Sequence, residues 1–339
     1  MSTINVLFLW KVPKPVRTRL QERLSQLSNL NLIFPKKAEE KTFLKYAATA
    51  HIIVGWRPSP PLLEQATSLQ LFIFPGAGVQ HLVDWFHETG KQRGITLVNG
   101  HANSVFVAQH VVALLLALLN KVIPHHNWMV AGEWRKGDFE AKTLPIKGRM
   151  IGLLGYGAIN QKVHKLLSSF DVTFSILRRS WPKASASLPT SAKQYTPDQL
   201  HEFLDKVDTL IVAIPLTVET EGLLGYNELT RLGKDGVVVN VSRGATIDQL
   251  ALYRVLKQQK IAGAAIDVWY TYQPNPDEAG RKYPYEQPFH SLDNIVLSPH
   301  RAASPFDDLD RWDEIVENVT RFAQGRKDFI NIVDTKRGY

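Results

Sequence analysis

A chain of 339 residues exceeds the length at which a single hydrophobic core usually stops growing, which predicts two domains. Hydrophobic residues make up 44% of the chain and charged residues 21%, a composition typical of soluble globular proteins and unlike that of collagen-like or disordered chains. The net charge of +8 comes from scattered Lys and Arg, which argues against nucleic-acid binding, and the absence of cysteine excludes disulfides and thiolate metal sites.

The first hundred residues alternate short apolar runs with helical patterns. The N-terminal segment lacks the basic residues and small-residue cleavage site of an export signal, so we expect a buried strand there. The alternation predicts an α/β domain. Its expected strands are Asn5–Leu9, His51–Val54, Leu71–Phe74 and Ile95–Val98.

The longest apolar run extends from Val111 to Leu119. It falls well short of the roughly 20 residues that cross a bilayer. Gln109 and His110 precede it directly, so we expect a buried helix and no membrane span. An apolar helix of this kind also suggests a homodimer.

A second alternating pattern begins at Met150. Apolar residues from Ile159 to Leu167 recur at helical spacing between its first two strands, which predicts a βαβ unit. Strands that alternate with helices in this way favour a doubly wound parallel sheet. The expected strands are Met150–Leu154, Val172–Leu177, Thr209–Ile214, Val237–Val241, Gly263–Val268 and Asn294–Leu297.

Two segments rich in proline, serine or charge, Ala184–Ser191 and Pro274–Gln287, are expected to be loops. From about Pro305 the pattern is helical again, and Gly325 offers a stop. We expect this C-terminal stretch to return to the first domain.

A glycine-rich turn follows the strand that begins at Met150. Gly155 would allow the tight turn, and Gly157 would let the backbone approach a pyrophosphate. The N–H groups at Ala158 and Ile159 would bind that group at the start of a helix. Asn160 replaces a third glycine, which only relaxes helix–strand packing. The pattern predicts a dinucleotide site; the alternative is a glycine-rich turn without a ligand.

The end of the following strand indicates which dinucleotide binds. NAD sites usually have an acidic residue there that accepts hydrogen bonds from the ribose, whereas Leu177 cannot. Arg178, Arg179 and Ser180 could instead hold a 2′-phosphate through charge-assisted hydrogen bonds. NADP(H) is therefore favoured, and NAD(H) stays open if the two arginines form only a solvated turn.

Several ordered motifs resemble the D-isomer-specific 2-hydroxyacid dehydrogenase family, which includes glyoxylate/hydroxypyruvate reductases, glycerate and phosphoglycerate dehydrogenases and formate dehydrogenase. The resemblance spans nearly the whole chain and is carried by Asn240–Gly244, Ile261–Trp269, Asn294–His300, Phe74–Val79, Val107–His110 and Asn331–Tyr339. It implies an α/β fold of two Rossmann-like domains with doubly wound parallel sheets, as in formate and glycerate dehydrogenases. It also implies hydride transfer between a nicotinamide and a small 2-oxo or 2-hydroxy acid.

The resemblance assigns roles to individual residues. Arg243 would grip the substrate carboxylate and polarise the 2-carbonyl, and His300 would be the acid/base. Asp267 would orient the nicotinamide amide, with Pro215 also among the cofactor-binding residues. Backbone N–H groups around Ala77, Gly78 and Val79 would bind the substrate carboxylate.

The chain departs from the family at one catalytic position. Where the family has a Glu that orients the histidine, or Gln in formate dehydrogenases, this chain has Tyr272. A tyrosine hydroxyl could still bond the imidazole, but a neutral partner does not raise its pKa as a carboxylate does. We therefore expect an acid-shifted or slowed reductase. Nearby alternatives for the missing partner are Gln273, Glu278 and Glu286.

Two other functions remain alternatives. Asn103 before the Val107–His110 motif resembles formate dehydrogenases, although it would also suit a plain helix N-cap. A dinucleotide-sensing regulator with weak turnover is the second, because a damaged acid/base pair could leave binding intact. Arg57 either reads a second anionic group of the substrate or is only solvent-exposed.

The expected architecture is a substrate domain from residues 1–104 and 303–339 and a dinucleotide-binding domain from residues 105–302. We expect a cytoplasmic homodimer that contains no metal. Its substrate is expected to be a small-molecule 2-oxo or 2-hydroxy acid.

Overall fold

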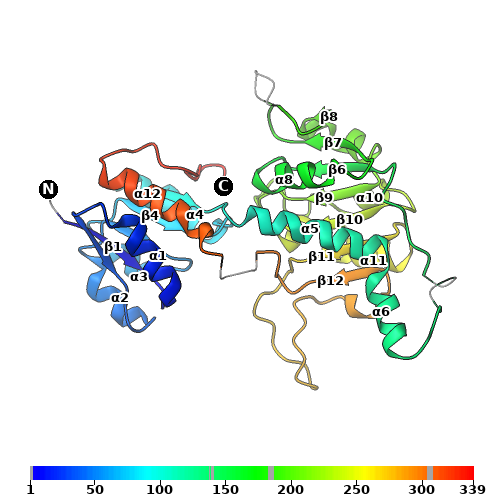
Figure 1. Cartoon of the computed structure of the whole chain (residues 1–339), viewed down its shortest axis with the longest axis horizontal. Helices are drawn as coiled ribbons and strands as arrows, with labels where there is room; N and C mark the ends of the chain where they lie inside the picture. Colours follow the sequence, from blue (N-terminus) through cyan, green and yellow to red (C-terminus); the bar gives the residue numbers. More distant parts are fainter. Residues whose placement is uncertain (1–2, 137, 139–140, 182–186, 304–307) are drawn as a thin grey trace. The chain divides into compact units, whose positions relative to one another are not determined.

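A computed structural model describes residues 3–136, 138, 141–181, 187–303 and 308–339 (Figure 1). Its chain forms two units, one from Met1–Asn103 with Pro305–Tyr339 and the other from Ser104–Ser304. Each unit is built around a parallel sheet with helices between its strands, which confirms the predicted α/β class. The expected helix start near Pro305 and the first part of the expected loop Ala184–Ser191 lie outside the described residues.

The first unit contains a five-stranded sheet in the order β2-β1-β3-β4-β5, with every pair parallel. Strand β2 was not predicted from the sequence, because it is a short edge strand that is only partly buried. The strands are β1 (Ile4–Phe8), β2 (Leu30–Ile33), β3 (Ile52–Val54), β4 (Leu71–Phe74) and β5 (Thr96–Asn99). The helices are α1 (Lys14–Leu24), α2 (Glu40–Ala47), α3 (Pro60–Gln65), α4 (Gln80–Trp85) and α12 (Asp313–Ala323).

The second unit contains a seven-stranded parallel sheet in the order β12-β11-β10-β9-β6-β7-β8. Counted from β6, this is the strand order of a dinucleotide-binding fold, and its direction of winding reverses between β6 and β9. The strands are β6 (Met150–Leu154), β7 (Thr173–Leu177), β8 (Ala192–Tyr195), β9 (Thr209–Val212), β10 (Val237–Asn240), β11 (Gly263–Ile266) and β12 (Ile295–Leu297). The helices are α5 (Ser104–Leu119), α6 (Val122–Val130), α8 (Ala158–Leu167), α9 (Leu200–Leu204), α10 (Tyr226–Thr230) and α11 (Gln249–Lys257).

The apolar run Val111–Leu119 belongs to α5, which packs against α8 and the strands β10 to β12 (Figure 1). Its side chains Val111, Leu115 and Leu119 are fully buried in the core of the second unit. Intramolecular packing therefore accounts for the apolar character of this helix. Among the described residues no single helix is long and apolar enough to cross a membrane, although α5 and α6, bent by 63°, satisfy that test as a pair.

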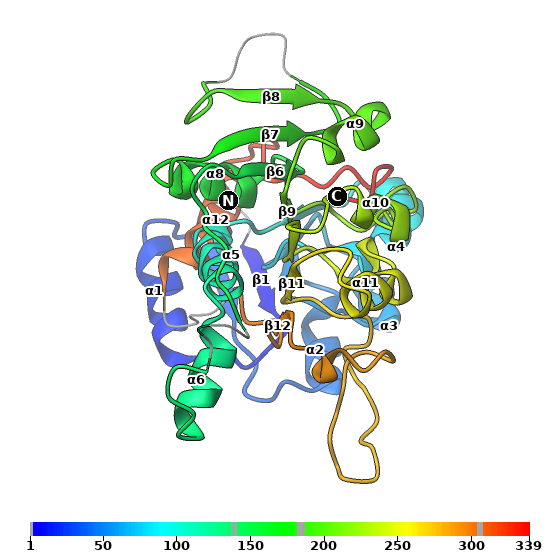
Figure 2. The same ribbon diagram turned by 90° about the vertical axis from the view of Figure 1, so that its right-hand side faces the viewer.

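The connection between β11 and β12 is a long loop that extends from the sheet, at the bottom of Figure 2. The N–H groups of Tyr270 and Thr271 both donate to the carbonyl of Pro284, at 3.2 and 3.0 Å. These bonds close the base of the loop, and the ring of Trp269 lies 4.9 Å from that of Tyr285. The loop therefore leaves the sheet and returns at a closed neck.

Candidate active site

The carboxyl ends of all strands in the second sheet meet at one edge, because the strands are parallel. Most of the site residues expected from the sequence follow directly after these strands. In the order of the sheet, from β12 through β11, β10, β9 and β6 to β7, they are His300, Asp267, Arg243, Pro215, Gly155 and Arg178. The fold thus lines up residues that are far apart in the chain.

The glycine turn lies at the point where the sheet reverses its winding, between β6 and β9. Gly155 has a φ of +84°, and a Cβ there would lie 2.6 Å from the carbonyl oxygen of Ala213, so only glycine fits. A Cβ at Gly157 would meet no atom within 4 Å, which leaves open space beside the turn. The N–H groups of Ala158 and Ile159 begin α8 behind it. These features fit a dinucleotide pyrophosphate.

Asn160 does more than relax the packing of α8. Its side chain is fully buried, and the amide Nδ2 donates to the carbonyl of Gly155 at 2.7 Å, with longer bonds to Leu154 and Ile211. This bond was not predicted from the sequence. The glycine that is usual at this position has no side chain and could not form it. Asn160 therefore ties the glycine turn to the ends of β6 and β9.

The end of β7 carries the three polar residues expected at a ribose phosphate. The Arg178 guanidinium lies 5.4 Å from the ring centre of Trp181. Arg179 forms an ion pair with Glu219, and Ser180 is exposed. Pro215, after β9, is held in place by the Thr220 hydroxyl, which donates to its carbonyl at 2.7 Å.

Arg243 follows β10 in a turn whose shape depends on neighbouring side chains. The Asn240 amide donates to the Arg243 carbonyl at 3.1 Å, and the Thr246 hydroxyl donates to the same oxygen at 2.8 Å. A Cβ at Gly244 would lie 2.4 Å from the backbone of Trp269, so the Arg-Gly pair cannot tolerate a larger second residue. The Arg243 guanidinium is partly buried and donates to the Ser242 carbonyl at 2.7 Å.

His300 and Tyr272 form a direct pair. The imidazole Nδ1 of His300 lies 2.9 Å from the Tyr272 hydroxyl oxygen, and the two rings meet edge to face at 5.2 Å. Tyr272 thus occupies the place expected for the missing carboxylate. Gln273, Glu278 and Glu286, the other candidates for this role, are exposed residues of the same loop.

The turn that carries His300 is held by a buried carboxylate. His300 has a φ of +55°, a left-handed conformation that non-glycine residues adopt only when their surroundings impose it. The Asp267 carboxylate accepts the N–H groups of Arg301 at 2.7 Å and Ala302 at 3.0 Å, and also the Ser298 hydroxyl. In this structure Asp267 is therefore a positioning residue for the histidine.

Two residues of this network were not assigned from the sequence. The Ser298 hydroxyl lies 2.9 Å from Nε2 of His110, and the same nitrogen lies 3.6 Å from Oδ1 of Asp267. His110 stood in a family motif, and Ser298 stood two residues before His300. The contact between His110 and Ser298 depends on the packing of α5 against β12, which the sequence did not predict.

Burial and charge act together on the titration of the pair. Burial lowers the pKa of His300 most, Asp267 raises it, and the positive charge of Arg243 lowers it further. Because the residue keeps solvent contact, solvent screening limits the size of this shift. Burial raises the pKa of the Tyr272 hydroxyl, which keeps it a neutral partner. Burial lowers the pKa of Arg243.

Asp267 stays an anion despite its burial. Burial alone raises the pKa of this carboxyl, but the hydrogen bonds from His110, Ser298, Arg301 and Ala302 outweigh that effect and lower it overall.

The expected substrate residues lie in the first unit. Ala77, Gly78 and Val79 form the turn between β4 and α4, at the carboxyl edge of the smaller sheet. The Asn99 amide donates to the Ala77 carbonyl at 2.8 Å, which fixes the turn. Arg57 is exposed after β3, and Asn103 is the last residue before α5.

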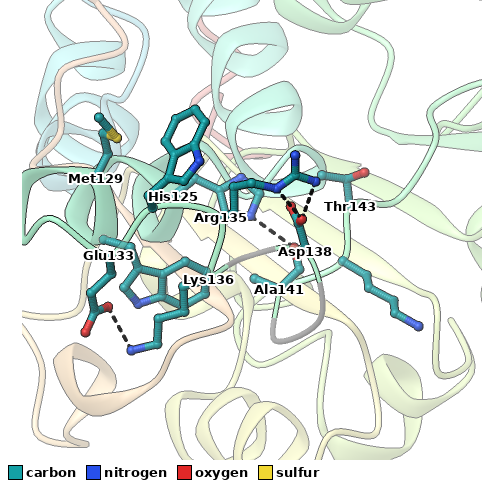
Figure 3. A pocket seen from close by; sticks show the side chains of 11 residues that line it. His125, Met129, Glu133, Arg135, Lys136, Asp138, Ala141 and Thr143 are labelled. Carbon is teal, nitrogen blue, oxygen red and sulfur yellow. Dashed lines mark hydrogen bonds and ion pairs between the residues drawn. The ribbon is translucent and has the colours of Figure 1, made fainter.

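A pocket of about 600 Å³ lies elsewhere in the second unit, beside α6 and the turn after it (Figure 3). Four of its charged side chains form ion pairs, Arg135 with Asp138 and Lys136 with Glu133. None of the residues at the strand ends lines it. This pocket is therefore not the candidate active site.

The fold of the second unit and the residues that follow its strands at the carboxyl edge are typical of nicotinamide-dependent oxidoreductases. The model of the NAD-binding domain of D-isomer specific 2-hydroxyacid dehydrogenases matches residues 112–302. The chain belongs to the D-isomer specific 2-hydroxyacid dehydrogenase family. The resemblance, the fold class and the enzyme class predicted from the sequence are thereby confirmed.

Individual relatives agree with this assignment. A glyoxylate/hydroxypyruvate reductase of Arabidopsis thaliana is 32% identical over 306 residues, which cover 89% of this chain and 86% of that protein. A D-3-phosphoglycerate dehydrogenase of Methanocaldococcus jannaschii is 29% identical over 251 residues, which cover 74% of this chain but only 44% of that protein. An NADPH-dependent glyoxylate/hydroxypyruvate reductase of Sinorhizobium meliloti, solved with NADP and malonate, has a TM-score of 0.74 at 26% identity and covers 99% of this chain and 98% of that one.

Proposed function

We propose that the protein reduces small 2-oxo acids to 2-hydroxy acids with NADPH as the preferred hydride donor. The observation that carries the proposal is the pair of His300 and Tyr272 at the same sheet edge as Arg243 and the glycine turn. When bound, the nicotinamide supplies the hydride. The printed descriptions of the Arabidopsis and Sinorhizobium proteins as reductases of glyoxylate and hydroxypyruvate support this substrate class.

Residues of the chain bind the substrate, polarise its carbonyl and supply the proton. The Arg243 guanidinium pairs with the substrate carboxylate and polarises the 2-carbonyl. In the first unit, the N–H groups of the Ala77–Val79 turn are the carboxylate donors that the family resemblance implies. Protonated His300 donates its Nε2 proton to the carbonyl oxygen, while Nδ1 stays bonded to Tyr272. Asp267 keeps the His300 turn in place.

NADPH preference is supported by the residues after β7. Leu177 is apolar where an acidic residue would bind the ribose hydroxyls, and Arg178, Arg179 and Ser180 follow it. The guanidinium of Arg178, stacked beside Trp181, presents donors suited to a phosphate. NAD(H) would be bound more weakly through the same glycine turn.

A substrate panel tests the proposal. We expect purified protein to oxidise NADPH faster than NADH with at least one of glyoxylate, hydroxypyruvate, pyruvate, phenylpyruvate and 2-oxoglutarate, followed by near-ultraviolet absorbance. Oxidation of formate with NADP⁺ and no reduction of any 2-oxo acid would instead identify a formate dehydrogenase. Tight NADPH binding without turnover of any acid would identify a dinucleotide-sensing regulator.

The pH dependence of reduction should show the effect of having Tyr272, instead of a carboxylate, beside His300. Reduction needs His300 in its protonated form, so the rate falls as pH rises through the pKa of His300. Because burial lowers that pKa and Tyr272 is neutral, we expect the fall to begin below the ordinary histidine value of about 6.5. In the variant Tyr272→Glu, a carboxylate beside Nδ1 should move the fall upward by about 1 pH unit or more.

The measurement is the profile of kcat/KM for the 2-oxo acid against pH, with Tyr272→Phe as the matched control. The phenylalanine variant removes the hydroxyl without adding charge, so its profile should not move upward. A Tyr272→Glu profile that overlays the wild type would show that His300 is not the titrating acid.

We also propose a homodimer, on a different structural basis from the one expected. The Val111–Leu119 stretch packs into the core of its own unit. In contrast, α6 and the turn after it leave large apolar side chains in solvent. Val130 and Trp134 are 75% and 74% exposed. An apolar surface of this kind is typical of subunit interfaces.

A further inference from the structure

The first unit has its own ligand-binding geometry. In its strand order, β2-β1-β3-β4-β5, the direction of winding reverses between β1 and β3. Ligands of open parallel sheets bind outside the carboxyl ends of the strands at this kind of reversal. Trp10 comes two residues after the end of β1, and Trp56 comes two residues after the end of β3. Two indoles therefore stand where this sheet would hold a ligand.

These indoles belong to a tryptophan cluster of Trp10, Trp56 and Trp312. The ring centres of Trp10 and Trp56 are 4.7 Å apart and meet edge to face, and Trp312 stacks on Trp10 at 5.8 Å. Trp312 lies just before α12 and is buried, whereas Trp10 and Trp56 keep part of their surface in solvent. Trp10 and Trp56, which are partly exposed, thus offer aromatic surface at the sheet edge, and Trp312 packs behind them.

The cluster is not explained by core stability alone. The indole Nε1 of Trp312 is buried and has no hydrogen-bond acceptor among the residues that the structure describes. A buried donor without an acceptor destabilises a fold, and buried tryptophans usually find one. A phenylalanine at residue 312 would keep an aromatic ring in the cluster without burying a donor.

The tryptophan cluster is tied to the turn proposed to bind the substrate carboxylate. His81, on α4 directly after the Ala77–Val79 turn, bonds through Nε2 to the carbonyl of Trp56 at 2.7 Å. Its ring also meets that of Phe74, the last residue of β4, at 5.6 Å. Since β3 and β4 are neighbours in the sheet, Trp56 and the turn lie side by side. A substrate whose carboxylate sits on the turn would direct its other end toward the indoles.

We propose that the tryptophan cluster binds the substrate side chain and that the preferred substrates are 2-oxo acids with an aromatic ring on C3. This inference rests on the proposed reduction of 2-oxo acids and narrows its substrate class. An aromatic ring gains contact with the faces and edges of Trp10 and Trp56, whereas glyoxylate, which has no side chain, gains nothing from them. Arg57, exposed beside Trp56, would instead favour a second carboxylate.

The test compares kcat/KM for phenylpyruvate, 4-methyl-2-oxovalerate, 2-oxoglutarate and glyoxylate with NADPH. We expect phenylpyruvate to exceed glyoxylate by about tenfold or more. In the variant Trp56→Ala the ratio of phenylpyruvate to glyoxylate should fall by about tenfold, whereas Trp56→Phe, the matched control, should keep most of it. Thermal melting of each variant shows whether it is folded.

A second readout is independent of turnover. Phenylpyruvate should quench the intrinsic tryptophan fluorescence of the wild type in the presence of NADP⁺, and the quench should shrink in Trp56→Ala. A preference for glyoxylate or 2-oxoglutarate, or equal ratios in the two Trp56 variants, would overturn the assignment of the cluster while the reductase function stands. Failure to reduce any of these four acids, and hydroxypyruvate and pyruvate as well, would instead reject the reductase function itself.

Discussion

The variant His300→Asn is expected to lower kcat for 2-oxo acid reduction by about 10²- to 10⁴-fold, because it removes the proton donor that we propose for the reaction. Asparagine suits this test because it tolerates the left-handed backbone found at His300, where φ is +55°. The bonds from the backbone N–H groups of Arg301 and Ala302 to the Asp267 carboxylate do not involve the side chain of residue 300 and should persist. The measurement is the single-turnover rate with saturating NADPH.

NADPH affinity, measured by fluorescence titration, is the control for this variant, since the glycine turn lies several strands away from β12. Affinity near that of the wild type together with the lost rate would locate the defect in proton transfer. A single-turnover rate within a factor of a few of the wild type would assign the acid to another group.

The variant Arg243→Lys is expected to lower kcat/KM for the 2-oxo acid by about 10²- to 10³-fold. Lysine keeps the positive charge but cannot present two parallel donors to a carboxylate while also reaching a carbonyl. The fold should tolerate the change, because the turn is held by the Asn240 and Thr246 bonds to the backbone carbonyl of residue 243. Steady-state kinetics over a range of acid concentrations separates the effects on KM and kcat.

Arg231→Lys is the matched control, because Arg231 pairs with Asp205 and lies among surface side chains. Its kcat/KM should stay close to that of the wild type. If Arg243→Lys were equally active, the carboxylate would have to be bound by other donors, and Arg243 would be reassigned to a structural role.

The residues that depend on local backbone geometry could be predicted from the sequence. In the sequence, Gly155 and Gly157 lie between an apolar run and an amphipathic helix, and the structure places them at the reversal of the larger sheet. Arg243 and His300 were assigned by resemblance, and parallel strands bring their segments to one edge. Strand β8 was missed because its sequence, with two exposed polar residues at the sheet edge, lacks the apolar run of a central strand.

What could not be predicted depends on contacts between distant segments. The link from His110 through Ser298 to Asp267 joins α5, β12 and β11, and none of these residues signals the others in the sequence. The same holds for the tryptophan cluster, because Trp312 lies far along the chain from Trp10 and Trp56. The partner of His300 was predictable only in part. The sequence suggested Tyr272 as one candidate, and the structure showed its 2.9 Å bond to His300.

Transfer of deuterium from NADPH labelled at C4 of the nicotinamide is the sharpest test of hydride transfer to a 2-oxo acid by this protein. The protein is mixed with each C4-deuterated stereoisomer of NADPH and a 2-oxo acid that it reduces, and the product is analysed by mass spectrometry. We expect that one stereoisomer delivers one deuterium to C2 of the 2-hydroxy acid. A 2-hydroxy acid without deuterium from either stereoisomer, or no product despite bound NADPH, would contradict it.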